Sequence, residues 1–265
     1  VNGIAMVIAR EVTQRPLILC YIGAWHGELP YVMNLMSRHV KYRVPADIHN
    51  VVHLPYPYCY RCPFGAEYPS CGLQCVEYIE MVLETVAPPE KTAALIYEAI
   101  QVPNGFVFPP KEYWPKIHKI CKEHGILTIV DEVITFQWSG TWLAVENWGV
   151  VPDMLTSAKS LAFGAPLSIL VGKGEIMDKA LEVARVAGTK SSMGGSPIAC
   201  AAAIAGIEVT KRDNLLEKAV RDGEYFMKGL AEIAEKHDLI GDIRGKGLLI
   251  GVELVKDKKT KEPAT

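Results

Sequence analysis

Two ionisable side chains lie in apolar surroundings at positions that could support chemistry. Asp131 ends the apolar run "ILTIV", and Lys159 follows 28 residues later in the small-residue segment "TSAKSLAFGAP". An acid at the end of a buried strand lies where open parallel sheets bind ligands. A loop of small side chains lets a flat molecule approach the lysine closely. The pair therefore indicates a ligand site at one edge of a sheet.

A carboxylate and a lysine in this arrangement suit pyridoxal phosphate. The lysine amine can form a Schiff base with the aldehyde, and the carboxylate can keep the pyridine nitrogen protonated, so that the ring accepts electrons. From the spacing alone, a strand-end acid and a solvated lysine is the commoner explanation. Other motifs must decide between the two.

Four cysteines form a second candidate site. Cys59, Cys62, Cys71 and Cys75 lie within "YCYRCPFGAEYPSCGLQC", residues 58–75. Four thiolates can surround a zinc ion, although these two pairs are closer together than in most zinc ribbons. A disulfide and a packed loop of reduced thiols are the alternatives. We expect reduced thiols and no metal.

Composition excludes several classes of protein. The 265 residues are 49% hydrophobic and 22% charged, with a net charge of −2, so no bulk electrostatic attraction favours nucleic acid or an anionic membrane. There is no apolar run of the roughly 18 residues that a membrane helix needs, and no signal-peptide pattern. We expect a cytoplasmic protein with neither nucleic-acid nor membrane partners.

The order of apolar segments predicts an α/β fold. Strand-like runs at 91–100 and 125–133 flank a helical segment from Lys111 to His124, which favours a parallel sheet between helices. Residues 154–172 are predicted as turn, loop and strand. Further segments are predicted as helices at 197–212 and 214–237 and as a strand pair at 240–257.

The two ends of the chain suggest a piece of a longer protein. The first residues already have helical spacing without a methionine or a capping residue, and the last ten are the charged run "KDKKTKEPAT". We therefore expect truncation at both ends.

Five ordered motifs resemble class III pyridoxal-phosphate aminotransferases, the group of 4-aminobutyrate and ornithine aminotransferases, dialkylglycine decarboxylase and some amino-acid racemases. The motifs are "CYIGAWHGE", "ALIYEAIQVPNGFVFPP", "TIVDEV" with "TSAKSLAFGAP", "SSMGGSPIACAAA" and "IGDIRGKGLLIGVELVKD". The resemblance implies pyridoxal-phosphate fold type I. It implies a three-layer large domain at 1–237, lacking its N-terminal part, and the beginning of a smaller C-terminal α+β domain at 238–265.

The resemblance assigns four residues to the cofactor ring. Lys159 matches the Schiff-base lysine and is the expected catalytic residue. Asp131 matches the partner of the pyridine nitrogen. Val133 matches the residue on the ring face away from the substrate, and Trp25 the aromatic on the opposite face.

The resemblance implies roles for further residues, on motifs that are less specific. Ser192 matches a family threonine that binds the cofactor phosphate from the neighbouring subunit, which implies a homodimer or a higher homo-oligomer. Glu98 matches a glutamate facing the substrate, with a structural ion pair as the alternative. His26 is expected to be a hydrogen-bonded turn residue, with tuning of the site beside Trp25 as the alternative, and Arg244 is expected to brace the domain junction.

The sequence also departs from the family. Ile134 replaces a glutamine that hydrogen-bonds the cofactor's phenolic oxygen. Phe136, Trp138 and Phe163 are bulky where the family is small. The upstream serine-glycine turn for the phosphate and the downstream arginine for the substrate α-carboxylate have no counterpart here.

The resemblance implies transfer of an amino group between an ω- or α-amino acid and a 2-oxo acid, through an aldimine on Lys159. Racemisation and decarboxylation by the same cofactor are alternatives. A non-catalytic truncated or split paralogue is another.

Overall fold

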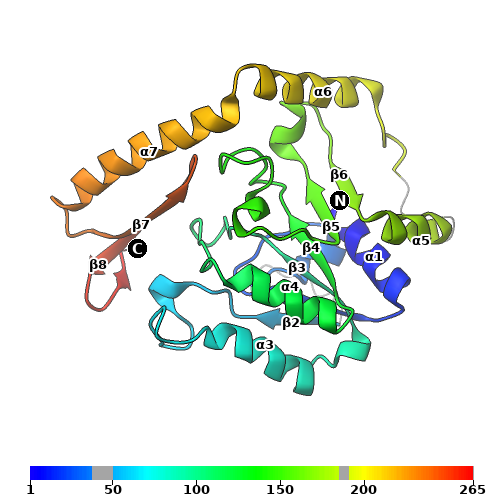
Figure 1. The fold of residues 1–265 in the computed structure, drawn as a ribbon, viewed down its shortest axis with the longest axis horizontal. Helices are drawn as coiled ribbons and strands as arrows, with labels where there is room; N and C mark the ends of the chain where they lie inside the picture. Colours follow the sequence, from blue (N-terminus) through cyan, green and yellow to red (C-terminus); the bar gives the residue numbers. More distant parts are fainter. Residues whose placement is uncertain (38–49, 185–190, 265) are drawn as a thin grey trace.

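A six-stranded sheet forms the centre of the molecule (Figure 1). A computed structural model describes residues 1–37, 50–184 and 191–264. The strand order is β2-β1-β3-β4-β5-β6, with β1 to β5 parallel and β6 antiparallel to β5. The strands are β1 (Leu17–Tyr21), β2 (Val51–Leu54), β3 (Thr92–Tyr97), β4 (Leu127–Asp131), β5 (Met154–Ser157) and β6 (Ile169–Gly172).

Helices cover both faces of this sheet. On one face, α3 (Gln74–Thr85) and α4 (Tyr113–Glu123) share a buried cluster with Leu19 and Tyr21 of β1. On the other face, α1 (Asn2–Thr13) and α5 (Gly174–Ala184) pack with Ile18 and Cys20. Alternate residues of one strand are thus buried on opposite faces, which explains its unbroken apolar sequence. The predicted three-layer α/β architecture is confirmed.

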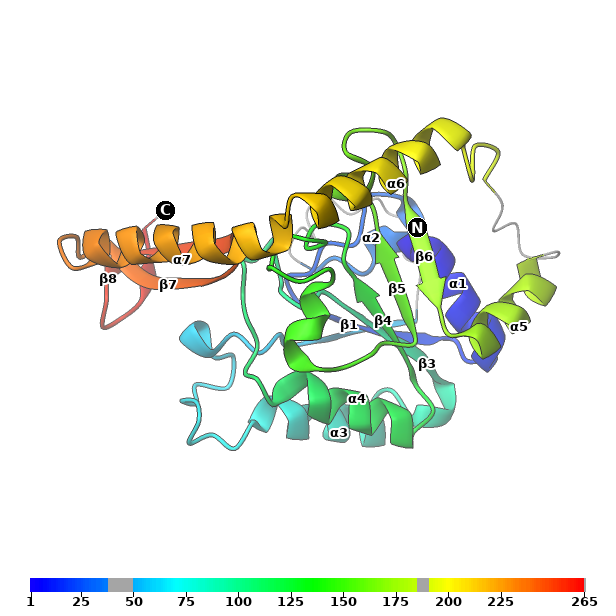
Figure 2. The ribbon, with the colours of Figure 1, turned by 45° about the horizontal axis from the view of Figure 1, so that its top comes forward.

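A second, three-stranded sheet follows two long helices. The short helix α2 (Pro30–Met33) packs with α1 through Val32. Helix α6 (Pro197–Arg212) packs through Ala203 on Leu161 and Ala162, and α7 (Leu215–Ala234) continues from it toward the second sheet (Figure 2). Beyond them, β7 (Ile240–Lys246), β8 (Leu249–Asp257) and β9 (Glu262–Pro263) pair antiparallel.

The contact between α7 and the β7–β8 turn requires glycine. A Cβ at Gly223 would lie 2.0 Å from the carbonyl oxygen of Gly247, which itself has φ +56°. Any side chain at Gly223 would push α7 off the turn.

The sequence predicts a boundary between two domains at 237/238. That boundary stays a prediction.

Most predicted elements are confirmed, with one correction. The helices expected at 111–124, 197–212 and 214–237 are α4, α6 and α7, and the strand pair is β7 with β8. Residues 154–157 were expected as a turn but form β5. Four residues carry little periodicity, and pairing with both β4 and β6 makes them a strand.

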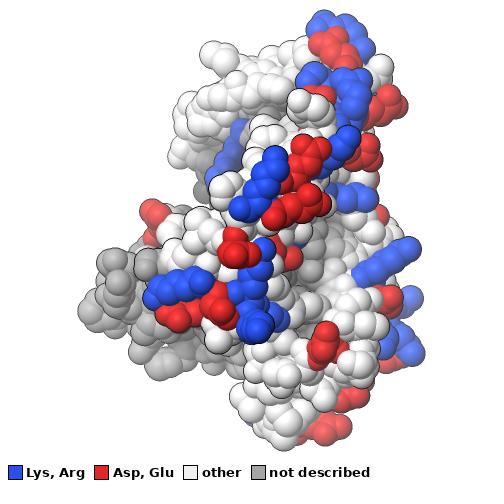
Figure 3. Space-filling view, turned by 90° about the vertical axis from the view of Figure 1, so that its left-hand side faces the viewer, with Lys and Arg blue, Asp and Glu red and all other residues white. Residues whose placement is uncertain are grey.

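The visible surface carries no large patch of one charge. On the face shown in Figure 3, Lys and Arg side chains alternate with Asp and Glu. None of the helices in the described ranges combines the length and apolar character needed to cross a membrane.

Candidate active site

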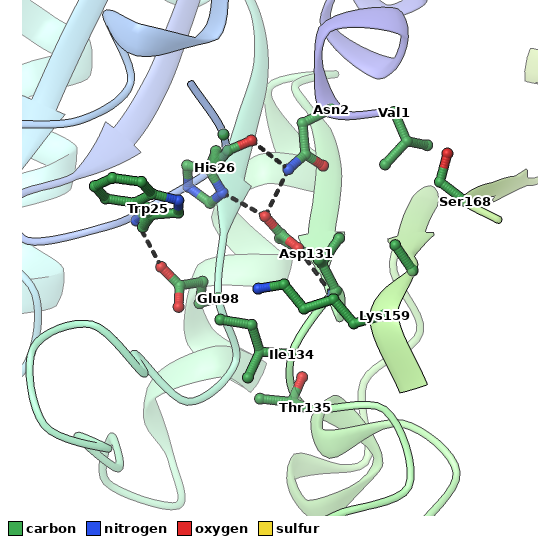
Figure 4. A pocket seen from close by; sticks show the side chains of 13 residues that line it. Val1, Asn2, Trp25, His26, Glu98, Asp131, Ile134, Thr135, Lys159 and Ser168 are labelled. Carbon is green, nitrogen blue, oxygen red and sulfur yellow. Dashed lines mark hydrogen bonds and ion pairs between the residues drawn. The ribbon is translucent and has the colours of Figure 1, made fainter. Parts of the chain in front are cut away.

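Four parallel strands bring their carboxyl ends to one pocket of about 260 Å³. Trp25 and His26 follow β1, Glu98 follows β3, Asp131 ends β4, and Lys159 follows β5. Because parallel strands end at the same edge of a sheet, side chains distant in sequence meet there. Figure 4 shows these side chains around the pocket.

Asp131 is the centre of the hydrogen bonds in this pocket. Its side chain is 5% exposed. Oδ2 accepts from Nδ1 of His26 and from Nδ2 of Asn2, both at 2.7 Å, and Oδ1 accepts from the backbone N–H of Val133 at 3.0 Å. A carboxylate has about four acceptor positions, so roughly one is left for a further donor.

His26 is a buried imidazole paired with this carboxylate. Burial lowers its pKa, but the hydrogen bond and charge of Asp131, with a smaller contribution from Glu98, outweigh burial and raise the pKa above its usual value. Its Nε2 is buried and has no hydrogen-bond partner among the described residues. The sequence favoured a hydrogen-bonded turn residue over a residue that tunes the site; the structure shows the hydrogen bond and places His26 in the pocket itself.

Glu98 is buried and accepts two backbone hydrogen bonds. Oε1 accepts from the N–H of Trp25 at 2.9 Å, and Oε2 from the N–H of Val102 at 3.1 Å. Burial raises its pKa to about 7, with Asp131 adding to the rise and His26 and the two N–H groups opposing it. Near neutral pH this group can therefore exchange a proton with small changes in its surroundings.

Lys159 extends into the pocket from a strained position (Figure 4). It begins the short 3₁₀ helix Lys159–Ala162 and has φ +46°, a left-handed conformation that costs a non-glycine residue roughly 1 kcal/mol or more. Strain of this kind persists where the surrounding fold imposes it. Here it directs the lysine amine toward Asp131 and Glu98.

Five of the six predicted site residues line this pocket. They are Trp25, Glu98, Asp131, Val133 and Lys159. Ser192 is not among the lining residues; it is exposed, in the turn before α6. A role in the site of a second subunit stays a prediction. Ile134 also lines the pocket, so an apolar side chain occupies the position where the family resemblance implies a glutamine.

Three polar residues that line the pocket were not predicted from the sequence: Asn2, Thr135 and Ser168. Of these, Asn2 donates to Asp131. No motif marks a residue 129 positions away from its partner. The only available signal was a polar side chain in an otherwise apolar helical pattern.

The four-cysteine loop surrounds a separate, narrow cavity of about 20 Å³. All four thiols are free and line it. Burial, followed by the neighbouring thiols, raises the pKa of Cys75 to about 12 and also raises that of Cys59. Within residues 1–37, 50–184 and 191–264, no group of three or more His, Cys, Asp or Glu side chains is arranged so that it could hold a metal ion. Whether the protein lacks a metal stays a prediction.

The chain belongs to the class III aminotransferase family, whose model matches residues 2–265. A leucine/methionine racemase of Thermococcus litoralis is 42% identical over 99% of this chain and 59% of the relative. A probable 4-aminobutyrate aminotransferase of Bacillus subtilis is 34% identical over 98% of this chain and 59% of the relative. The chain thus spans about three fifths of the length of these relatives.

Solved structures show the same fold. An amine transaminase from an uncultivated Pseudomonas species, in a pyridoxal-phosphate-bound form, has a TM-score of 0.91 at 29% identity, over 99% of this chain and 62% of that one. An (S)-enantioselective omega-transaminase from Thermomicrobium roseum has a TM-score of 0.89 at 32% identity, over 98% and 60%. The fold is pyridoxal-phosphate fold type I, and the implied cofactor is pyridoxal 5′-phosphate.

The residues present fit this cofactor. Asp131 retains an acceptor position for a protonated ring nitrogen, and Nε2 of His26 is a buried polar atom that a ligand or water could satisfy. The lysine amine enters the same pocket, and the half-buried Trp25 and Val133 line it. The site therefore combines a cation partner, an amine and apolar walls for a flat ring.

Proposed function

We propose that the protein containing this chain transfers an amino group between an amino acid and a 2-oxo acid. The observation that carries the proposal is that Lys159 and Asp131 meet in one pocket with Trp25 and Val133. An α-amino donor becomes a 2-oxo acid and an ω-amino donor becomes an ω-oxo acid, while the acceptor 2-oxo acid gains the amino group. The proposal covers donors whose amino group is on the ω-carbon and donors whose amino group is on the α-carbon.

The cofactor, when bound, would supply a ring that takes up the electrons released at the carbon that carries the substrate amino group. Asp131 would hold the ring nitrogen through a charge-assisted hydrogen bond. Lys159 would attach the cofactor and move a proton at the carbon that carries the amino group, as general base and acid. Trp25 and Val133 would cover the ring faces, and Glu98 would face the substrate.

Replacing Lys159 tests this function. Added pyridoxal phosphate should give the native protein an absorbance band near the visible edge, and Lys159→Ala should remove that band and lower turnover at least 100-fold. Lys179→Ala, which changes an exposed lysine of α5, is the control and should leave the band unchanged. A native protein without a lysine-dependent band would contradict catalysis by this chain and favour the non-catalytic alternative.

Racemisation is a second candidate because the 42% identical relative is named a leucine/methionine racemase. Assays with and without a 2-oxo acid separate the two reactions. A racemase interconverts the enantiomers of an amino acid without an acceptor. An aminotransferase without an acceptor stops after about one amino group per site. Release of carbon dioxide would instead identify a decarboxylase.

A further inference from the structure

The hydrogen bonds around Asp131 continue away from the pocket through two buried side chains. Nδ2 of Asn2 donates to Oδ2 of Asp131 at 2.7 Å and to the backbone oxygen of His26 at 2.8 Å. The hydroxyl of Thr156 donates to Oδ1 of Asn2 at 2.6 Å. Asn2 comes from the first turn of α1, Thr156 from β5 and Asp131 from β4, so this chain of hydrogen bonds joins three separate elements.

These bonds fix the orientation of the Asn2 amide. With the Thr156 hydroxyl donating to the amide oxygen, the NH₂ group must face Asp131 and the backbone of His26. A rotated amide would place its oxygen against the carboxylate of Asp131 and the backbone oxygen of His26, and both hydrogen bonds would be lost. Thr156 is held beside Asp131 because the two residues are register partners in the β4–β5 ladder. The direction of the network therefore follows from the fold.

Asp131 accepts hydrogen bonds from the neutral amide of Asn2 and from the titratable imidazole of His26. Burial favours the uncharged form of a carboxyl group, whereas donated hydrogen bonds favour the charged form. His26 can gain or lose a proton, and Glu98 also faces it. The amide of Asn2 does not titrate, so it donates to Asp131 at every working pH. Asp131 thus keeps one donor that does not depend on His26.

We propose that Asn2 and Thr156 are positioning residues that act through Asp131, holding its carboxylate in the orientation that meets the cofactor's ring nitrogen. This inference rests on the proposed function. It assigns the N-terminal turn of α1 a part in controlling the protonation of the ring. A merely structural role would affect folding alone.

The test compares Thr156→Val, Thr156→Ser and Asn2→Leu with the native protein. Absorbance titration measures pyridoxal phosphate affinity. The NMR signal of a ¹⁵N-labelled ring nitrogen, followed against pH, measures where the bound ring loses its proton. Asn2→Leu should weaken affinity about tenfold, as expected for one lost hydrogen bond to a charged group. Thr156→Val removes a hydrogen bond to the neutral amide of Asn2 and should weaken affinity about fivefold. Both variants should lower the pH midpoint of the ring signal by about one unit. Thr156→Ser keeps a donor and should restore both values.

Thr92→Val is the matched control. Thr92 is also buried, and its hydroxyl donates to the backbone oxygens of Ala87 and Pro88 at 2.9 and 3.0 Å, at the opposite end of the parallel sheet. This variant should lose stability while keeping the native affinity and ring midpoint. Thermal unfolding of all variants separates stability from the cofactor readouts.

The outcomes distinguish this inference from the function beneath it. If the native protein shows a lysine-dependent band but Thr156→Val and Thr156→Ser share the native midpoint, the positioning role is wrong and the proposed function stands. If the native protein shows no such band, both fail. If Asn2→Leu does not fold, the Val and Ser variants at position 156 still decide the result.

Discussion

Burial sets the protonation of Glu98 at the scale of a single residue. Its pKa of about 7 lies above the ordinary value of 4.5, chiefly because its side chain is buried. A raised pKa means that folding favours the protonated form. This contribution to stability is fully present below about pH 4.5 and is lost as the pH rises through 7. Glu132, whose pKa burial also raises to about 7, contributes in the same direction.

Glu98→Gln should therefore flatten the dependence of unfolding free energy on pH. Relative to the variant, the native protein should lose on the order of 3 kcal/mol between pH 5 and 8. Urea denaturation across this range measures the difference. Glu84→Gln, at an exposed position of α3, is the control. A constant difference between native protein and Glu98→Gln at all pH values would show that Glu98 titrates normally.

The sequence predicts the residues of this pocket that come with local motifs. Asp131 and Lys159 each follow an apolar strand, and the strand order determines that they meet. Asn2 and Thr156 could not be predicted in the same way. Their contacts depend on how α1 packs on the sheet and on the register between β4 and β5, and neither is written in a local pattern.

Elements of the fold were predictable in proportion to their length and periodicity. The 16 residues of α6 have the small apolar composition of a packed helix, and its bounds match the prediction. The four residues of β5 carry too little pattern, and their strand conformation comes from pairing on both sides. The docking of the second sheet also depends on contacts between residues far apart in the sequence, such as Arg61 with Glu253.

An ion-pair network docks this second sheet. Glu253 of β8 accepts hydrogen bonds from the hydroxyl of Tyr58, from Nε of Arg61 at 2.6 Å and from Nη2 of Arg244 at 3.0 Å. Arg244 also donates to the backbone oxygens of Gly105 and Phe106. It therefore braces the sheet against the large domain, in line with the bracing role expected from the sequence.

Glu253→Gln should loosen the second sheet. Losing a charged acceptor shared by three donors should cost about 2 kcal/mol, because a hydrogen bond to a charged group contributes about 1.5–3 kcal/mol. Hydrogen exchange should show faster exchange of β7 and β8 amides, with β1 to β5 unchanged. Glu262→Gln removes only the exposed pair with Lys256 and should have a much smaller effect. Equal effects of the two variants would contradict the docking role of Glu253.

At the scale of the whole molecule, one chain accounts for only part of the predicted site. Ser192 lies outside the pocket that Lys159 enters, in an exposed turn. The nearby apolar side chains of Met193 and Ile198 are 77% and 81% exposed. Exposed apolar side chains of this kind are typical of surfaces that another chain covers. We therefore predict a homodimer in which Ser192 of one subunit contacts the cofactor phosphate held by the other.

Mixed dimers test this arrangement directly. Ser192→Ala alone should weaken pyridoxal phosphate binding about tenfold, the effect of one hydrogen bond to a charged group. Ser191→Ala is the neighbouring control and should bind normally. Co-expressing Lys159→Ala and Ser192→Ala chains produces dimers with one site that has both native residues only if Ser192 acts across the interface. With random pairing of the two chains, titration should then show half of the lysine-containing sites binding with native affinity, and the other half, in Ser192→Ala homodimers, binding with the weakened affinity. If all remaining lysine-dependent sites bind with the weakened affinity, Ser192 acts within its own chain; a monomer by light scattering would exclude the arrangement altogether.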